Sequence, residues 1–333
     1  NYSPGSTIKP IVALSALENG IIKPNFTVKC EGKTEMYGQT YHCWKKKGHG
    51  FVDLRNAMKQ SCDSYFYEVA RRLGVDRLSE TAINFGLGKR VLGDTFESEK
   101  KGLIPNTKWK KNNLGAGWLL GETIITGIGQ GYIQTTPLQL CLMTAQIANG
   151  GFKIKPHIIH DKNINFENAK FKISKQFIND SLTNNQITKE SFLEDREYQL
   201  YERLHKNSKN INFIKDAMFG STNEQYGTSY KSRYENLKYQ FAGKTGTSQV
   251  RRITEADREL DLKQSQIEYK NRDHALYIAF APYKDPRYSI SVLVEHGGSG
   301  SKAAAPLASK LIKKIIDRHK LREQIRKGNL KTA

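Results

Sequence analysis

Two apolar segments near the C-terminus, residues 275–281 and 288–294, are separated by the turn-forming sequence Tyr-Lys-Asp-Pro-Arg at 283–287. Side chains in each segment alternate with the period of two that strands show, so the pair predicts an antiparallel hairpin. Helices are predicted at the start of the chain and after the glycines near 297–300. This arrangement indicates an α+β fold, an antiparallel sheet flanked by helices with a mostly helical subdomain, rather than a doubly wound parallel sheet.

The two terminal helices each carry an apolar stripe. In the first, Pro4-Gly5 breaks the chain, Ser6 or Thr7 can cap, and the helix ends at Gly20. The last helix is predicted to bury one face formed by Leu307, Leu311, Ile312, Ile315 and Ile316. Shorter helices are predicted at about 53–58, 64–73, 76–85 and 138–148, loops at 86–121, short strands and loops at 26–50, and a strand at 239–243 that enters a glycine-bearing turn.

The chain has a formal net charge of +20, which raises the question of nucleic-acid binding. Basic residues are spread along the whole sequence, with the densest runs at 45–47, 108–111 and 310–331, and acidic residues are mixed among them. Zinc-finger repeats, RNP-like aromatic motifs and basic zippers do not accompany these runs. We therefore expect a basic solvated surface near an anionic partner such as a membrane or a cell-wall polymer, and no nucleic-acid partner.

The 333 residues suffice for a large core, and no stretch approaches the roughly 18 uninterrupted apolar residues of a membrane span. The sequence opens at Asn1 without a start Met or an apolar signal segment, so we expect a soluble piece of a longer protein. We expect one domain over residues 1–320, a peripheral insertion at 157–215 that is rich in Asn, Lys and Glu, and a basic tail at 321–333.

Ser6 and Lys9 form a Ser-x-x-Lys motif at the start of the first predicted helix. One helical turn puts residues i and i+3 on the same face, so the Lys9 amine can lie beside the Ser6 hydroxyl. A serine hydroxyl is a poor nucleophile until a base removes its proton, and a lysine kept neutral by burial and cationic neighbours is such a base. The same spacing recurs in a charged loop and after a glycine-rich turn, at Ser98/Lys101 and Ser299/Lys302.

Two further short motifs offer side chains that could act together with Ser6 and Lys9. Ser61-Cys62-Asp63, between two predicted helices, offers a hydroxyl and a carboxylate that could face the nucleophile. Lys244-Thr245-Gly246-Thr247 is predicted to lie on a strand, where the glycine leaves room for a ligand near the backbone and the other side chains offer donors to a carboxylate. Looser matches to the second motif occur in polar stretches, at Ser208/Asn210 and Ser221/Asn223.

Ser-x-x-Lys, Ser-x-Asn/Asp and Lys-Thr-Gly, in this order, form the signature of penicillin-binding proteins and β-lactamases. The chain resembles the transpeptidase domain of class B penicillin-binding proteins, particularly the penicillin-binding protein 2 subfamily of cell elongation. The resemblance extends to residues 4–10, 61–67, 127–139 and 297–306 and covers nearly everything outside 157–215. It implies the penicillin-binding/β-lactamase-like transpeptidase fold, with no cofactor for catalysis.

The resemblance implies a role for each catalytic residue. Ser6 would attack the carbonyl of a D-alanyl-D-alanine stem peptide of peptidoglycan, and Lys9 would accept its proton. Ser61, assisted by Lys244, would relay a proton to the leaving group, while Asp63 would hold the hydrogen-bond network. The terminal D-alanine would leave, and an amine from a neighbouring stem peptide would resolve the acyl-enzyme into a crosslink.

The resemblance also implies how substrate is held. The backbone N–H groups of Ser6 and Thr247 would form the oxyanion hole. Thr245 and Thr247, beside Gly246, would bind the substrate carboxylate or that of a β-lactam antibiotic. Trp44, Trp109 and Trp118 are expected to be partly buried under loops rather than to line a glycan groove.

Two features depart from the broader family. Asp63 stands where Asn is usual, although penicillin-binding protein 2 members commonly carry Asp there. The family's inner-membrane anchor, pedestal domain and first strands precede the point at which this sequence begins. The resemblance therefore implies a periplasmic domain, and contacts with glycan-polymerising and rod-shape membrane proteins through upstream regions.

Cys30, Cys43, His49 and Cys62, within the region 26–62, make a set of three thiolates and one imidazole, a combination that favours tetrahedral zinc. Their spacings of 13, 6 and 13 residues fit no zinc-finger pattern. A disulfide, free buried thiols and an ordinary loop histidine remain alternatives. The resemblance favours a structural zinc, because some penicillin-binding protein 2 members hold one in this region with acid, His and Cys ligands.

Other functions remain open at this point. A serine β-lactamase of the same fold would hydrolyse the acyl-enzyme quickly, whereas a transpeptidase would hold a penicillin adduct for many minutes. A non-catalytic β-lactam sensor would acylate Ser6 without making crosslinks. A nucleic-acid binder would show binding that falls steeply with salt.

Overall fold

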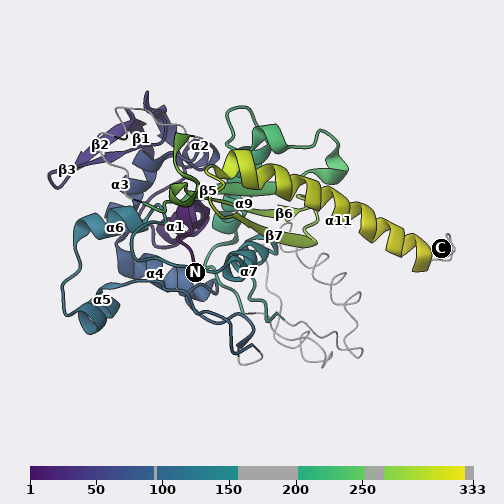
Figure 1. Cartoon of the computed structure of the whole chain (residues 1–333), viewed down its shortest axis with the longest axis horizontal. Helices are drawn as coiled ribbons and strands as arrows, with labels where there is room; N and C mark the ends of the chain where they lie inside the picture. Colours follow the sequence, from purple (N-terminus) through teal and green to yellow (C-terminus); the bar gives the residue numbers. More distant parts are fainter. Residues whose placement is uncertain (94–95, 157–201, 252–256, 258–265, 327–333) are drawn as a thin grey trace, which may run out of the picture. The chain divides into compact units, whose positions relative to one another are not determined.

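A three-stranded antiparallel sheet in the order β5-β6-β7 lies at the centre of the structure, which is a computed structural model (Figure 1). Its strands are β5 (Ala242–Ser248), β6 (His274–Ala281) and β7 (Tyr288–Val294), and the predicted hairpin is confirmed as β6-β7. Alternate residues of β6 enter two different apolar cores, Leu276 and Ile278 on one face, Ala275 and Tyr277 on the other. The alternation therefore separates two buried faces rather than a core from solvent.

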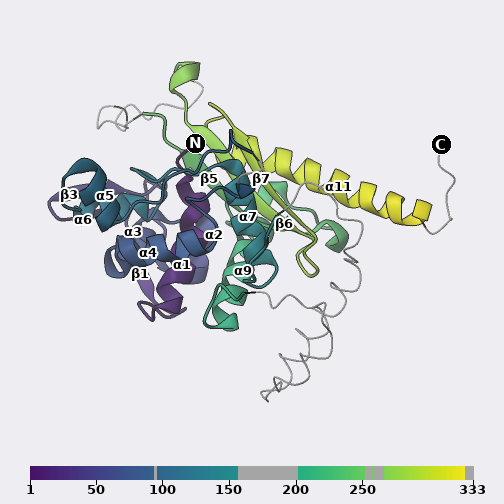
Figure 2. The ribbon, with the colours of Figure 1, turned by 90° about the horizontal axis from the view of Figure 1, so that it is seen from below.

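The C-terminal helix covers one face of this sheet (Figure 2). A π-helical turn, η8 (Gly300–Ala304), leads into α11 (Ala305–Arg326), which continues without a break past residue 321. Ile312 and Ile316 are buried as predicted, whereas Leu307 and Leu311 are 46% and 45% exposed and do not belong to the buried face. Small residues take their place against the sheet at Ala304, Ala305 and Ala308, which lets the helix lie close to the strands.

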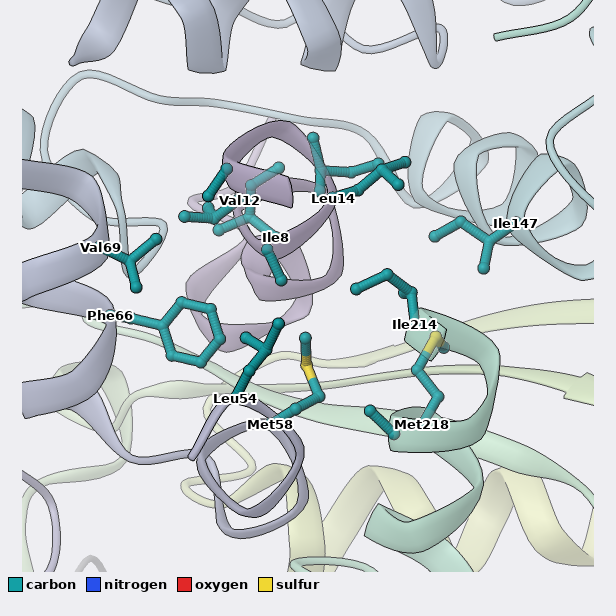
Figure 3. Close-up of a cluster of buried hydrophobic side chains, with 14 of the residues drawn as sticks. Ile8, Val12, Leu14, Leu54, Met58, Phe66, Val69, Ile147, Ile214 and Met218 are labelled. Carbon is teal, nitrogen blue, oxygen red and sulfur yellow. The ribbon is translucent and has the colours of Figure 1, made fainter. Parts of the chain in front are cut away.

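Helices pack on the other face of the sheet around α1 (Lys9–Glu18), whose residues are buried from Lys9 to Leu17. Figure 3 shows apolar side chains from several elements meeting there, among them Ile8, Phe66 and Met218. The surrounding helices are α2 (Leu54–Gln60), α3 (Asp63–Leu73), α4 (Val75–Asn84), α7 (Pro137–Ala148) and α9 (Ser208–Asn223). Because nearly every residue of α1 is buried, it is the central helix of this layer.

Short elements complete the layer. Strand β1 (Thr27–Cys30) pairs with β4 (Gly50–Asp53), and β2 (Lys33–Met36) pairs with β3 (Gln39–His42), both antiparallel. The expectation of loops throughout 86–121 was wrong, because α5 (Thr107–Leu114) begins there where the Asn106 side chain caps the Trp109 N–H at 2.7 Å. Helix α6 (Leu120–Thr126) follows, and the described residues also form the short helices η1 (Gly5–Ile8), η4 (Tyr230–Ser232), η5 (Leu237–Tyr239) and η7 (Tyr269–Asn271).

Two boundaries differ from the sequence-based prediction. The strand expected at 239–243 begins only at Ala242 and continues straight through Gly243, while 237–239 forms η5. Residues 208–215, expected in the peripheral insertion, form the first half of α9, and Ile211 and Ile214 lie in the main core. The apolar pattern of this helix is weak, and its packing against α1, α2 and β5 stabilises it.

The structure describes residues 1–93, 96–156, 202–251, 257 and 266–326. The chain divides into two compact units, one formed by 1–154 with 203–333 and the other by 155–202. All elements above belong to the first unit, and most of the expected insertion lies outside the described residues. Within the described residues, no helix is both long and apolar enough to span a membrane.

Candidate active site

Ser6 lies on η1, the tight turn that leads into α1. This turn is pressed against two other segments, since the Gly5 N–H donates to the Gly129 carbonyl at 3.0 Å and β5 runs alongside. A Cβ on Gly246 would lie 2.7 Å from Thr7 Cγ2 and 2.9 Å from the Pro4 carbonyl oxygen. Only a glycine at 246 therefore lets strand β5 approach the Ser6 turn so closely.

Lys9 is fully buried one turn after Ser6. Its Nζ forms an ion pair with Asp63 Oδ1 at 2.7 Å and donates to Ser61 at 3.1 Å (carbonyl) and 3.3 Å (Oγ). The predicted direct contact with Ser6 is not formed as a hydrogen bond among the described residues. The amine is directed instead at the second motif, because a buried ammonium requires a charged partner.

Ser61 lies between helices α2 and α3 with φ 56° and ψ 42°, the left-handed conformation. A non-glycine residue there costs about 1–2 kcal/mol, so the surroundings must hold it. Its Oγ lies 2.8 Å from Lys244 Nζ and 3.3 Å from Lys9 Nζ. The predicted association of the three motifs is thus present in the structure, with Ser61 Oγ as the atom on which both lysines converge.

The two lysines differ in their surroundings. Lys244 is completely buried, and this burial, followed by the positive charge of Lys9, lowers its pKa well below the usual lysine value, with Asp63 opposing the shift. Lys9 has the carboxylate of Asp63 at 2.7 Å. Two ammonium groups around one hydroxyl are unfavourable in a low dielectric, so we place the charge on Lys9 and the neutral amine on Lys244.

A cleft of about 930 Å³ opens over these groups, lined by Ser6, Ser61, Asp63, Thr245, Gly246 and Thr247. The Thr245 hydroxyl donates to Thr228 Oγ1 at 2.8 Å, and the Gln130 side chain donates to the Thr247 carbonyl at 2.9 Å. These two partners, which sequence reasoning missed, fix the far wall of the cleft.

Of the competing motif matches, only Ser299 and Lys302 also line this cleft. The other Ser-x-x-Lys match, Ser98 and Lys101, is exposed. Ser208/Asn210 and Ser221/Asn223 lie on α9, where Asn210 and Asn223 donate to Glu18 and to backbone carbonyls.

Trp44 also lines the cleft, whereas the sequence predicted a side chain partly buried under loops and away from any binding groove. The residue is 59% exposed. Its backbone N–H donates to Asp63 Oδ2 at 3.0 Å, and its indole N–H donates to the Gln60 and Ser61 carbonyls, each at 3.1 Å. The sequence signal that could have identified it is its position directly after Cys43.

The predicted metal ligands Cys30, Cys43, His49 and Cys62 come together next to the cleft, with their ligand atoms within 4.8 Å of one another. His49 Nδ1 lies 3.5 Å from both Cys30 Sγ and Cys43 Sγ. All three cysteines are free, so the disulfide alternative is not realised. Hydrogen bonds from Cys62 and His49 lower the pKa of the Cys43 thiol. Three sulfurs and one imidazole this close together fit a tetrahedral zinc ion.

A helix-borne serine, two buried lysines and a Lys-Thr-Gly strand, on an antiparallel sheet flanked by helices, define the serine–lysine class of acyl-transferring proteins. The model of the penicillin-binding protein transpeptidase domain matches residues 1–313. The chain belongs to this family.

Individual relatives agree with this assignment. The chain is 35% identical to the peptidoglycan D,D-transpeptidase MrdA of Salmonella typhimurium over 318 residues, which is 95% of this chain and 46% of that protein. It is 31% identical to MrdA of Escherichia coli K12, over 95% of this chain and 45% of that one. The chain thus spans about half the length of the curated relatives that it matches.

Solved structures show the same fold. A complex between a penicillin-binding protein (PBP2) and MreC from Helicobacter pylori aligns with a TM-score of 0.74 at 31% identity, over 95% of this chain and 50% of that chain. PBP2 of Pseudomonas aeruginosa in complex with WCK 5153 aligns with a TM-score of 0.72 at 34% identity, over 94% and 60%. The predicted transpeptidase fold is confirmed.

Proposed function

We propose that this chain is the catalytic domain of a serine D,D-transpeptidase, which crosslinks peptidoglycan stem peptides during cell-wall elongation and is acylated by β-lactams at Ser6. The observation that carries this proposal is the convergence of Lys9 and Lys244 on Ser61 Oγ in the cleft that Ser6 lines. Such an arrangement supplies both a base and a proton relay beside a hydroxyl nucleophile.

The acylation step follows from the placement of charge. Lys9 must give up its proton before it can accept one, and Ser61 Oγ, hydrogen-bonded to both amines, provides a path for that proton to neutral Lys244. Neutral Lys9 then takes the proton of Ser6 as its oxygen attacks the carbonyl carbon of the penultimate D-alanine. When the peptide bond breaks, Lys244 returns its proton through Ser61 to the departing D-alanine amine.

The other cleft residues would hold substrate through this step. The N–H groups of Ser6 and Thr247 would stabilise the oxyanion, and the Thr245 and Thr247 hydroxyls would bind the terminal carboxylate. Asp63, whose two oxygens accept from Lys9 and from the Trp44 N–H, would keep the Lys9 amine in place. An amine of a second stem peptide then attacks the acyl carbon, the ester bond to Ser6 Oγ breaks, and the proton that the amine loses is transferred through Lys9 to the released Ser6 oxygen as the crosslink forms.

Labelling with fluorescent penicillin tests this function. The purified protein is expected to form a covalent adduct that survives denaturation, and Ser6→Ala is expected to form none, because the attacking oxygen is gone. Ser98→Ala, which alters the exposed serine of a competing motif, is the matched control and should label like the wild type. Equal labelling of Ser6→Ala and the wild type would refute Ser6 as the nucleophile.

The lifetime of the adduct separates the two rival activities. An adduct that persists for many minutes supports a transpeptidase, whereas one that hydrolyses within seconds supports a serine β-lactamase. A stable adduct without crosslinking of stem-peptide substrates supports a β-lactam sensor.

We also propose that Cys30, Cys43, His49 and Cys62 hold a structural zinc ion. The support is the fit of three thiol groups and one imidazole whose ligand atoms lie within 4.8 Å of one another. Four protein ligands would leave no open position for substrate, so the ion would serve the fold rather than the reaction. Its place in the structure would be beside the second motif, since Cys62 adjoins Ser61 and Cys43 Sγ accepts from the Asp63 N–H at 3.4 Å.

Metal analysis tests the zinc proposal. The purified protein is expected to contain about one zinc per chain, and Cys43→Ser to contain much less, since a neutral hydroxyl is a poor zinc ligand. Cys141→Ser is the matched control, because Cys141 lies outside the cluster. Metal-free wild type purified without chelators would contradict the proposal.

The cellular setting is proposed from the family and its relatives. We propose that the intact protein is anchored in the inner membrane by a segment outside this sequence, with this domain in the periplasm. Its partners would be glycan-polymerising and rod-shape membrane proteins. The Helicobacter pylori PBP2 complex with MreC supports such partnerships.

A further inference from the structure

Trp44 is hydrogen-bonded to the second motif at two points, and the function proposed above uses only its backbone N–H, not its indole. Its indole N–H reaches the Ser61 carbonyl at 3.1 Å and its backbone N–H reaches Asp63 Oδ2 at 3.0 Å. Lys9 donates to the same two residues, at the Ser61 carbonyl and at Asp63 Oδ1. The residue that follows Cys43 in the thiol cluster is thus hydrogen-bonded to both polar residues of the motif.

The hydrogen bond from the Trp44 indole to the Ser61 carbonyl bears on the backbone conformation of Ser61. Ser61 has the left-handed backbone conformation, which L-residues avoid unless their surroundings hold them. Its carbonyl accepts from the Lys9 amine and from the Trp44 indole, both at 3.1 Å. If the serine returned to a more common conformation, its Oγ would leave the position between Lys9 and Lys244.

Trp44 is itself held from the side of the thiol cluster. Its ring meets that of His49 edge-on, with centroids 5.4 Å apart. Cys43, the residue before it, accepts from the Asp63 N–H. The indole therefore contacts His49 of the thiol cluster on one side and donates a hydrogen bond to the Ser61 carbonyl on the other.

We propose that Trp44 is a positioning residue, whose indole N–H holds Ser61 in the left-handed conformation that keeps its hydroxyl between the two lysines. This inference rests on the proposed function for its kinetic consequence, but its structural consequence does not depend on catalysis. The ring itself is mostly exposed, so its removal does not empty the core.

Trp44→Phe tests the proposal, because it keeps an aromatic ring and removes the N–H. The limiting rate of acylation by penicillin is expected to fall about fivefold to tenfold, the effect of one lost hydrogen bond, with the half-saturating penicillin concentration little changed. Trp118→Phe is the matched control, because it loses an indole hydrogen bond to Thr123 Oγ1 away from the cleft. It should acylate at the wild-type rate.

Three outcomes of this assay would overturn the proposal. Trp44→Phe could acylate at the wild-type rate, both variants could slow equally, or only the half-saturating concentration could rise, which would make Trp44 a substrate contact. Metal content is measured alongside, and a Trp44→Phe variant that is slow only because it has lost metal would also overturn it.

A crystal structure of Trp44→Phe separates failure of this inference from failure of the proposed function. If the wild type is not acylated while Ser61 in the variant moves out of hydrogen-bond distance of Lys244, the function fails and the positioning role stands. If Ser61 keeps its backbone conformation and its 2.8 Å contact with Lys244, the positioning role is refuted whatever the activity.

Discussion

Ser61 contacts two lysine amines, and within the described part of the chain only Lys9 of the two forms an ion pair. The difference follows from position: Lys9 on α1 faces the start of α3, where Asp63 lies, whereas Lys244 on β5 is surrounded by the core. Burial disfavours an ammonium that has no carboxylate beside it, so we assign the neutral amine to Lys244, next to the Lys9–Asp63 ion pair.

This charge assignment predicts a pH dependence at the scale of one residue. The lowered pKa of Lys244 means that it loses its proton, as pH rises, well before an ordinary lysine does. If neutral Lys244 is required, the acylation rate rises with pH through this lowered pKa and is level before pH reaches the ordinary lysine range near 10.4. The pH profile of penicillin acylation under single-turnover conditions measures this.

Lys244→Arg supplies the control for this profile. A guanidinium keeps its proton throughout the range, so the variant should acylate at least about 100-fold more slowly at every pH. A wild-type rate that is flat with pH, or that inflects only at the ordinary lysine value, would contradict the assignment of the neutral amine to Lys244.

At the scale of elements, the site depends on how closely strand β5 approaches the η1 turn. Gly246→Ala would place a methyl group 2.9 Å from the Pro4 carbonyl oxygen and 2.7 Å from Thr7 Cγ2, so the strand and the turn must separate. Since a displacement of about 1 Å at reacting groups lowers rates by up to about 100-fold, acylation should fall between tenfold and about 100-fold.

Gly117→Ala is the matched control for this substitution, because a Cβ there meets nothing within 4 Å. It should acylate like the wild type, and the comparison is made with second-order acylation rate constants and melting temperatures. If Gly246→Ala acylated as fast as Gly117→Ala, the close approach would be irrelevant to reactivity.

Most elements could be predicted from the sequence because their signals are local. The hairpin is defined by its turn and alternation, and the three motifs by their residue types. The exposure of Leu307 and Leu311 could not be predicted, since the helical stripe is compatible with two faces and only the alanines at 305 and 308 allow close packing on β6. Helix α9 was missed in part because its apolar spacing is weak and tertiary contacts stabilise it.

In the candidate site, too, only the local signals could be predicted. The motifs predict Ser6, Ser61 and Lys244 as site residues. They do not predict that the Lys9 amine points to Asp63, because this ion pair joins residues 54 positions apart. The indole of Trp44 is a similar case: its hydrogen bond to Ser61 depends on a left-handed backbone that no sequence pattern predicts.

At the scale of the whole described unit, the groups that we propose to react come from three segments that are far apart in the sequence and meet only through tertiary packing. Ser6 and Lys9 are carried by η1 and α1, Ser61 and Asp63 by the α2–α3 junction, and Lys244 by β5. None of these segments could assemble the site alone, so acylation competence and cooperative folding are expected to be inseparable properties of this unit.

The pairing of β5 with β6 has a further consequence for how this protein can fail. Lys244 lies opposite Ile278 and Thr245 opposite Tyr277, on the two faces of the sheet. A slip of one residue would exchange these faces, directing the amine away from Ser61 while the backbone ladder stayed nearly intact. Molecules with this shifted register would be compact but inactive. The activity of this fold therefore depends on β5 pairing with β6 in the correct register during folding.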